Sequence, residues 1–207
     1  MILAKLKLGN ETHAVKRSLI LEKAGQIFWQ KGYHSTSMKD IADACNCRPA
    51  NVYHYFKNKE DILYHVIRDI TERTVNSIKH LDKDDTTGPV EQIKSLVKSH
   101  LGLLGTMNKT NVLISDTGLR DLTPEHRQAI IEIRDIYDSI LCKVLRRGVE
   151  SGDFANIDER IISYFISSVI IRSNIWFSAG GRLSEDAIAD IMSKFIYGGI
   201  KTHGGEL

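Results

Sequence analysis

Apolar positions recur with the period of an α-helix along almost the whole chain, and few Pro and Gly residues interrupt the pattern. The first helix is expected from about His13 to Lys31, with Gly32 as its stop. One face of it carries Ile20, Ala24, Ile27 and Phe28. The pattern predicts an all-α fold.

Three further helices are expected directly after the first. Thr36 or Ser37 can cap a second helix with its hydroxyl, and Asp40, three residues after Ser37, approximates a capping box. Pro49 is well placed to open a third, very short helix that ends at Phe56. A longer helix runs from Glu60 towards Leu81.

The segment 82–88 is polar and unpatterned, and we place a domain boundary there. Residues 1–60 then form one domain, 61–81 a connecting helix and 82–207 a second helical domain. That domain shows apolar stripes at 90–107, 124–148, 158–179 and 184–200. The stripe at 158–179 is apolar almost all round, so its helix is either central or shared with another chain.

The second and third helices, joined by a tight turn at Asn46 and Cys47, have the layout of a helix-turn-helix. At the start of the third helix, Arg48 can bind guanine, Asn51 can bind adenine and Ala50 can touch a thymine methyl. We expect Val52 and Phe56 to anchor this helix on the core. The candidate DNA contacts are Thr36, Ser37, Arg48, Pro49, Ala50, Asn51, Tyr53, His54, Lys57 and Lys59.

The roles of these candidates differ. Tyr53 and His54 are expected to reach backbone oxygens of the DNA, and Ser37 and Lys59 stand near helix starts, where amides and positive charge attract phosphate. Residues 1–70 carry 11 Lys and Arg against 7 Asp and Glu, whereas the remainder carries 17 against 19. The basic excess of the first third favours a polyanionic partner.

The rest of the composition mainly excludes other classes. No window of about 18 to 20 apolar residues exists, and Lys interrupts the apolar start, so we expect a cytoplasmic protein without a membrane partner. Three cysteines are too few for a disulfide framework or a four-ligand zinc site, so we expect free thiols, no metal and no cofactor. No motif of a hydrolase, a phosphate loop or a metalloprotease is present, which argues against an enzyme.

The run from Gly32 to Leu63 closely resembles the DNA-binding domain of the tetracycline-repressor (TetR) family of bacterial regulators. The matching residues are Gly32, Tyr33, Thr36, Ser37, Ile41, Ala42, Tyr53, Tyr55, Phe56, Lys59, Glu60 and Leu63. Two positions depart from the family pattern: Asn46 replaces a common Gly, and Arg48 replaces a common Ser or Thr. Asn tolerates a left-handed turn, whereas Arg has no acceptor with which to cap a helix.

The resemblance implies a homodimer in which each subunit places its third helix in one half of an inverted-repeat operator, with a small hydrophobic effector bound by the C-terminal domain. It also implies dimerisation through the last two long helices. Independently, the helix apolar all round and the stripe of Ile188, Ile191, Met192 and Phe195 supply what a four-helix interface requires.

Residues 117–154 are similar to a TetR subgroup that responds to acyl-coenzyme A thioesters and controls fatty-acid or sterol-type catabolism. The similarity lies in Leu119, Arg120, Leu122, Pro124, Glu125, Arg127, the run 134–137 and the run 148–154. An acyl-CoA effector is therefore expected. The candidate ligand contacts are Arg172, Trp176, Arg120, His100 and Phe165.

Arg172 and Trp176, four residues apart, lie on one helix face, where Arg suits phosphate and Trp suits stacking on a base. The alternative is that both serve the dimer interface. His100 lies on an apolar stripe and is either a hydrogen-bonded core residue or a pocket residue.

A regulator of a drug or another hydrophobic compound stays open, as do, more remotely, a helical enzyme or an interaction protein. The sequence does not decide between repression and activation, and it names neither the operator nor the regulated genes. It also leaves open whether the arm before His13 is ordered.

Overall fold

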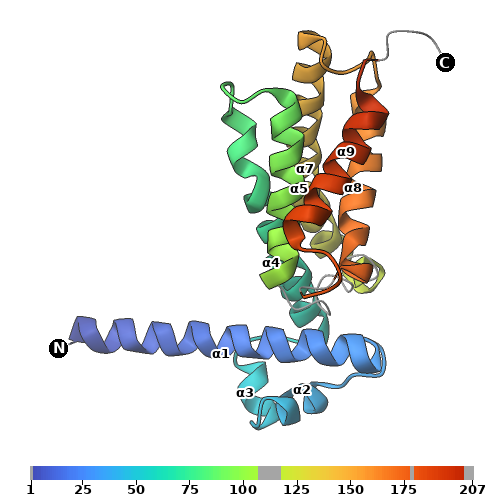
Figure 1. Cartoon of the computed structure of the whole chain (residues 1–207). Helices are drawn as coiled ribbons and strands as arrows, with labels where there is room; N and C mark the ends of the chain where they lie inside the picture. The colour runs from blue at the N-terminus through green and yellow to red at the C-terminus, as the bar shows by residue number, and fades with distance from the viewer. Residues whose placement is uncertain (1, 107–117, 178–179, 203–207) are drawn as a thin grey trace. The chain divides into compact units, whose positions relative to one another are not determined.

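The computed structural model describes residues 2–106, 118–177 and 180–202, and its regular elements there are helices. They are α1 (Ile2–Lys31), α2 (Met38–Ala44), α3 (Pro49–Tyr53), α4 (Lys59–Ile78), η1 (Lys79–Lys83), α5 (Pro89–Thr106), η2 (Gly118–Asp121), α7 (Pro124–Ser151), α8 (Glu159–Trp176) and α9 (Glu185–Ile200). The all-α prediction is confirmed (Figure 1).

The chain forms two compact units. Unit 1 comprises residues 1–70 and 110–130, and unit 2 comprises 71–109 and 131–207. The division falls within α4 and not at 82–88, where the sequence places a boundary. Apolar residues at the start of α4, such as Leu63 and Ile67, are buried in unit 1, whereas Ile78 near its end is buried in unit 2.

Helix α1 begins at Ile2, well before the start expected near His13. The early residues include Leu, Ala, Lys and Glu, which favour a helix, and the isolated Gly9 is tolerated within it. The backbone of the arm before His13, whose order the sequence left open, is therefore part of this helix. Further along, Ile20, Ala24 and Phe28 are buried in the core of unit 1.

The ends of α2 and α3 follow the local signals of the sequence. Ser37 and Asp40 form the capping box, with the Asp40 amide donating to Ser37 Oγ at 3.1 Å and the Ser37 amide donating to Asp40 Oδ2 at 2.7 Å. Asn46 adopts the left-handed conformation at φ 50°, and Arg48 precedes α3 without a side-chain cap. Helix α3 ends at Tyr53, short of Phe56, although the Phe56 amide still donates to the Val52 carbonyl.

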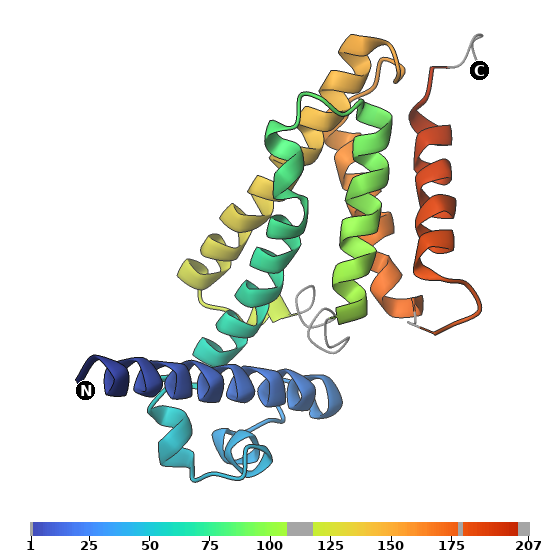
Figure 2. The same ribbon diagram turned by 60° about the vertical axis from the view of Figure 1, so that its left-hand side comes forward.

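In unit 2, α5 packs against α8 and α9, and Figure 2 shows these three helices side by side. Asp158 and Ser184 cap α8 and α9 by accepting from the amides of Ile161 and Ala187. The shared core includes Leu96, Val97, Leu101, Ile140, Leu141, Val144, Ile166, Ile170, Ala189, Met192, Ile196 and Ile200. Burial of one face of α8 leaves apolar residues on its other face, as its all-round pattern requires.

Near the end of α7, Gly148 lets an aromatic ring approach the helix backbone. The ring of Phe154 covers Gly148, and a Cβ at this position would overlap ring atoms of Phe154. The chain folds back here because the Phe154 amide donates to the Gly148 carbonyl at 2.9 Å. Phe154 is almost fully buried and contacts the ring of Tyr197 edge-on at 6.4 Å.

We predict that Gly148→Ala lowers the free energy of unfolding by about 1–3 kcal/mol, because overpacking outweighs the roughly 1 kcal/mol gain in helix propensity. Chemical denaturation measures the change. Gly88→Ala is the control, since a Cβ at Gly88 meets nothing within 4 Å. A Gly148→Ala protein as stable as the control would contradict the packing argument.

Candidate functional site

The exposed side of α3 forms the first candidate site. Val52 is fully buried and Phe56 is 1% exposed, so both anchor the helix as expected. The opposite side presents Arg48, Pro49, Ala50, Asn51, Tyr53 and His54 to solvent, and we call these six residues the recognition surface. Tyr53 is 54% exposed, a large aromatic surface for a residue of a folded domain.

Aromatic and cationic contacts with α1 hold the end of α3. The ring of His13 lies 4.6 Å from the Tyr55 ring and 6.0 Å from the His54 ring. Arg17 stands over the ring of Phe56 at 5.1 Å, a cation–π contact. Sequence reasoning missed these contacts because α1 and α3 lie far apart in the chain.

Lys59 binds backbone carbonyls of the loop before α2. Its ammonium donates to the carbonyls of Tyr33 and Thr36, both at 2.7 Å, and lies 4.4 Å from the centre of the Tyr33 ring. It also reaches the His34 carbonyl at 3.3 Å. Carbonyls of a tight loop lack helical partners, and an ammonium with three donors supplies them.

The side chains of Thr36, Ser37 and Lys59 each bond to other groups of the protein, and contact of Ser37 and Lys59 with phosphate stays a prediction. The Thr36 hydroxyl is buried and donates to the Gly32 carbonyl at 2.8 Å, and the Ser37 hydroxyl belongs to the capping box. Lys31 donates to Asp40 at 2.7 Å, and this bond, together with those from Ser37, holds the pKa of Asp40 well below its usual range. Lys57 remains exposed.

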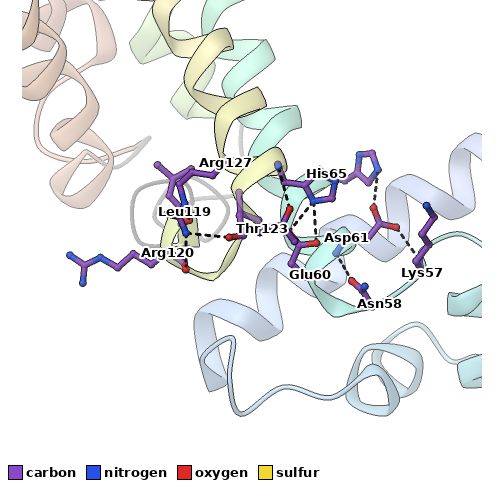
Figure 3. A network of polar contacts seen from close by, with 11 residues as sticks. Lys57, Asn58, Glu60, Asp61, His65, Leu119, Arg120, Thr123 and Arg127 are labelled. Carbon is purple, nitrogen blue, oxygen red and sulfur yellow. Dashed lines mark hydrogen bonds and ion pairs between the residues drawn. The ribbon is translucent and has the colours of Figure 1, made fainter.

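The start of α4 carries a second polar network, drawn in Figure 3. The Asn58 side chain accepts from the Asp61 amide at 2.8 Å, and Asp61 accepts from the Lys57 amide at 2.9 Å. Glu60 accepts from the Thr123 amide and contacts His126 Nδ1, both at 2.9 Å. These contacts tie the start of α7 to the DNA-binding helices within unit 1.

Two more contacts fix the same segment. The His126 ring stacks on Tyr64 at 3.9 Å between ring centres, and His34 pairs with Asp121 at 2.9 Å. Arg127 donates to the carbonyls of Leu119 and Leu122. In the ring stack and in the His34–Asp121 pair the partners are some 60 to 90 residues apart in the chain, so no local pattern indicated them.

The five residues expected to contact an effector lie in different surroundings. Arg120 lies in unit 1 with an exposed side chain. Arg172, Trp176 and Phe165 are exposed on α8, with Phe165 at 63% and Trp176 at 56%. His100 is buried inside unit 2, where its ring meets the Tyr137 ring edge-on at 6.5 Å.

Phe165 and Trp176 share the exposed side of α8 with other apolar residues. We call Ile161, Phe165, Val169, Trp176, Ile191 and Phe195 of α8 and α9 the outer apolar face; Phe195 is 70% exposed. Such a set of large apolar side chains is unusual on a monomer. It is the exposed surface that the all-round apolar pattern of α8 indicated.

Two searches for other chemistry found nothing within the described ranges. No three His, Cys, Asp or Glu side chains are grouped so as to hold a metal ion. No helix there combines the length and the apolar character needed to cross a bilayer. Cys45, Cys47 and Cys142 are free thiols.

An exposed short second helix in a helix-turn-helix is the arrangement found in a class of DNA-binding proteins. The sequence profile of bacterial regulatory proteins of the tetR family matches residues 20–66, and that of the tetracyclin repressor-like C-terminal domain matches residues 86–200. The chain belongs to the TetR family. It is a transcription regulator and not an enzyme.

Three relatives with known names are similar over most of the chain. The transcriptional repressor KstR2 of Mycolicibacterium smegmatis is 25% identical over 195 residues, which cover 93% of this chain and 94% of KstR2. The fatty acid metabolism regulator protein of Bacillus subtilis is 25% identical over 183 residues, or 87% of this chain and 93% of that protein. The crystal structure of AibR with isovaleryl coenzyme A and operator DNA matches with a TM-score of 0.75 and 25% identity, covering 88% of this chain and 98% of AibR.

We predict that Arg48→Ala and Asn51→Ala each weaken operator binding by about 1–3 kcal/mol per half-site, because each removes a candidate base contact. Fluorescence anisotropy with labelled upstream DNA measures the loss, and thermal unfolding should not change because both side chains are exposed. Asp43→Asn, exposed on α2, is the control. Unchanged affinity in both alanine variants would exclude base reading by this surface.

We predict that His100 makes the free energy of unfolding depend on pH. Burial lowers its pKa from 6.5 to about 4. Between these values the unfolded chain binds more protons than the folded chain, so the free energy of unfolding falls as pH drops from about 6.5 to 4, by up to about 3 kcal/mol.

Urea unfolding between pH 4.5 and 7.5 measures this pH dependence. His100→Leu should flatten the dependence, whereas His80→Gln, a change at an exposed histidine, should leave the profile of the wild-type protein. An equally steep profile in His100→Leu would show that other groups cause it.

Proposed function

We propose that the protein is a homodimeric repressor that an acyl-coenzyme A thioester releases from an inverted-repeat operator. The observation that carries the proposal is the recognition surface on α3, exposed and anchored from behind. The effector class is supported by the relatives, which include a fatty acid metabolism regulator and a regulator crystallised with isovaleryl coenzyme A and operator DNA.

A homodimer is supported by the outer apolar face. Burial of this face, apart from Trp176, against a second copy removes five large apolar side chains from water, and a two-fold axis makes the same surface complementary to itself. Two recognition surfaces then contact two half-sites of one operator. One half-site alone offers few contacts, so dimerisation is a condition for tight binding.

Arg172 and Trp176 are proposed to bind the nucleotide end of the thioester. Both are exposed on α8, four residues apart on one face, so guanidinium and indole can meet a phosphate and a flat base together. The alternative use of both residues in the dimer interface predicts a change in molecular mass on substitution, which the experiment below measures.

Release follows from a two-state equilibrium. The effector binds the free form of the protein more tightly than the DNA-bound form. The factor by which it lowers operator affinity is at most the ratio of these two effector affinities. The DNA contacts are largely electrostatic, so operator affinity should also fall steeply with salt.

The test is fluorescence anisotropy of the protein on DNA from its own upstream region, titrated with coenzyme A, a long-chain acyl-CoA and the free fatty acid. We expect release by the thioester alone. The variant Arg172→Ala/Trp176→Ala should lose this release, while light scattering still gives the mass of a dimer. Lys194→Ala, a change at an exposed charged residue of α9, is the control.

Tight operator binding that none of the three compounds changes would keep the repressor and favour another hydrophobic effector. A wild-type protein with the mass of a monomer would contradict the dimer. A monomeric double variant would assign Arg172 and Trp176 to the interface.

A further inference from the structure

His100 and Tyr137 bring two polar groups into the interior of unit 2. His100 is 3% exposed and Tyr137 is 5% exposed. His100 Nδ1 and the Tyr137 hydroxyl oxygen are buried, and neither has a hydrogen-bond partner among the described residues. The two rings, from α5 and α7, meet edge-on with 6.5 Å between their centres.

Apolar side chains dominate the same stretches of both helices. Leu96, Val97 and Leu101 of α5 are fully buried, as are Leu141 and Val144 of α7. In this environment burial lowers the pKa of His100 and raises the pKa of Tyr137, with Asp138 adding to the second shift. Both side chains are therefore uncharged at neutral pH.

Unpartnered polar groups in such an interior are costly. A buried donor or acceptor left without a partner loses its hydration without compensation, and most buried polar groups in folded proteins are paired. Two of them on facing side chains indicate a site that a further molecule completes.

A comparison within unit 2 supports this reading. Gln92 Oε1 and Arg147 Nε also lack partners among the described residues, but their side chains are already fixed, because both donate to the Asp84 carbonyl, at 2.6 and 2.7 Å. They complete a protein-to-protein network. His100 and Tyr137 have no such second bond within the described ranges.

We propose that His100 and Tyr137 form the polar end of the effector site and bind an uncharged oxygen, a carbonyl or a hydroxyl, on an otherwise apolar ligand. The proposal rests on the proposed function in placing the effector in unit 2. It deepens that function by assigning the ligand's uncharged oxygen to these two residues, whereas Arg172 and Trp176 are assigned its nucleotide end.

The chemistry selects against a charged ligand group. A tyrosine hydroxyl and a neutral imidazole N–H can both donate to one carbonyl oxygen, which has two lone pairs. A carboxylate would lose its hydration in apolar surroundings without meeting a positive charge. A thioester or ester carbonyl fits the pair, and a free fatty acid does not.

The test uses the full-length protein and three probes with the same acyl chain: methyl octanoate, octanoate and octanoyl-CoA. Calorimetry gives the affinities, and NMR of the protein labelled at histidine follows the His100 imidazole, assigned with His100→Leu. We expect methyl octanoate to bind at least about tenfold more tightly than octanoate and to shift the His100 resonances. Tyr137→Phe and His100→Leu should each weaken the ester about tenfold.

Thermal unfolding separates this role from a structural one. If the Tyr137 hydroxyl made a hydrogen bond within the protein, its removal would lower the unfolding temperature. Without ligand, Tyr137→Phe should unfold at the wild-type temperature or roughly 2–4 °C higher, because it removes an unpaired buried hydroxyl. The control Tyr197→Phe, at a tyrosine on the surface of α9, should change neither affinity nor stability.

Three results would overturn the inference: ester binding unchanged in Tyr137→Phe, a lower unfolding temperature in that variant, or no binding of any probe. Binding of methyl octanoate with no response to octanoyl-CoA would instead reject the acyl-CoA effector and keep the His100–Tyr137 site.

Discussion

The burial of Val52 and Phe56 is the constraint on which the DNA-binding surface depends. A helix as short as α3 does not persist in water alone, so its position comes from these two anchors and from the turn that delivers it. With the anchors inside, the spacing of the helix turns Arg48, Ala50 and Asn51 outward. The same two side chains thus stabilise α3 and orient the residues proposed to face DNA.

The polar side chains around α3 follow from the same constraint. A short helix and a tight loop leave backbone carbonyls and amides without helical partners, and Lys59, Thr36 and Ser37 supply those partners. Glu60 and His126 then join the start of α7 to this scaffold. A change in the segment 118–130 would therefore bear directly on the helices that carry the recognition surface.

Unit 2 has apolar residues on its surface and polar residues in its interior. Its outer apolar face exposes Phe165 and Phe195 to solvent, while its interior holds His100 and Tyr137 without partners among the described residues. Each is unfavourable in an isolated chain, and each would be relieved by the proposed binding, the first by a second subunit and the second by a ligand. The regulatory function proposed for the protein accounts for both features together.

The sequence by itself determined what depends on neighbours within one or two helical turns. The helical period predicted the all-α fold, the capping box of Ser37 and Asp40 marked a helix start, and Val52 and Phe56 separated the two sides of α3. Asn46 indicated the left-handed turn for the same local reason. The resemblance over residues 32–63 identified the family from these local signals.

Only the tertiary structure decided which side chains meet across long distances in the chain. It turned Lys59 and Thr36 inward, joined Glu60 to His126, and separated buried His100 from exposed Arg172 and Trp176. A pattern within one helix states which face a residue shares, but not whether that face meets a core, a partner or water. What a helix face meets depends on the packing between helices, and the spacing of residues along one helix does not determine that packing.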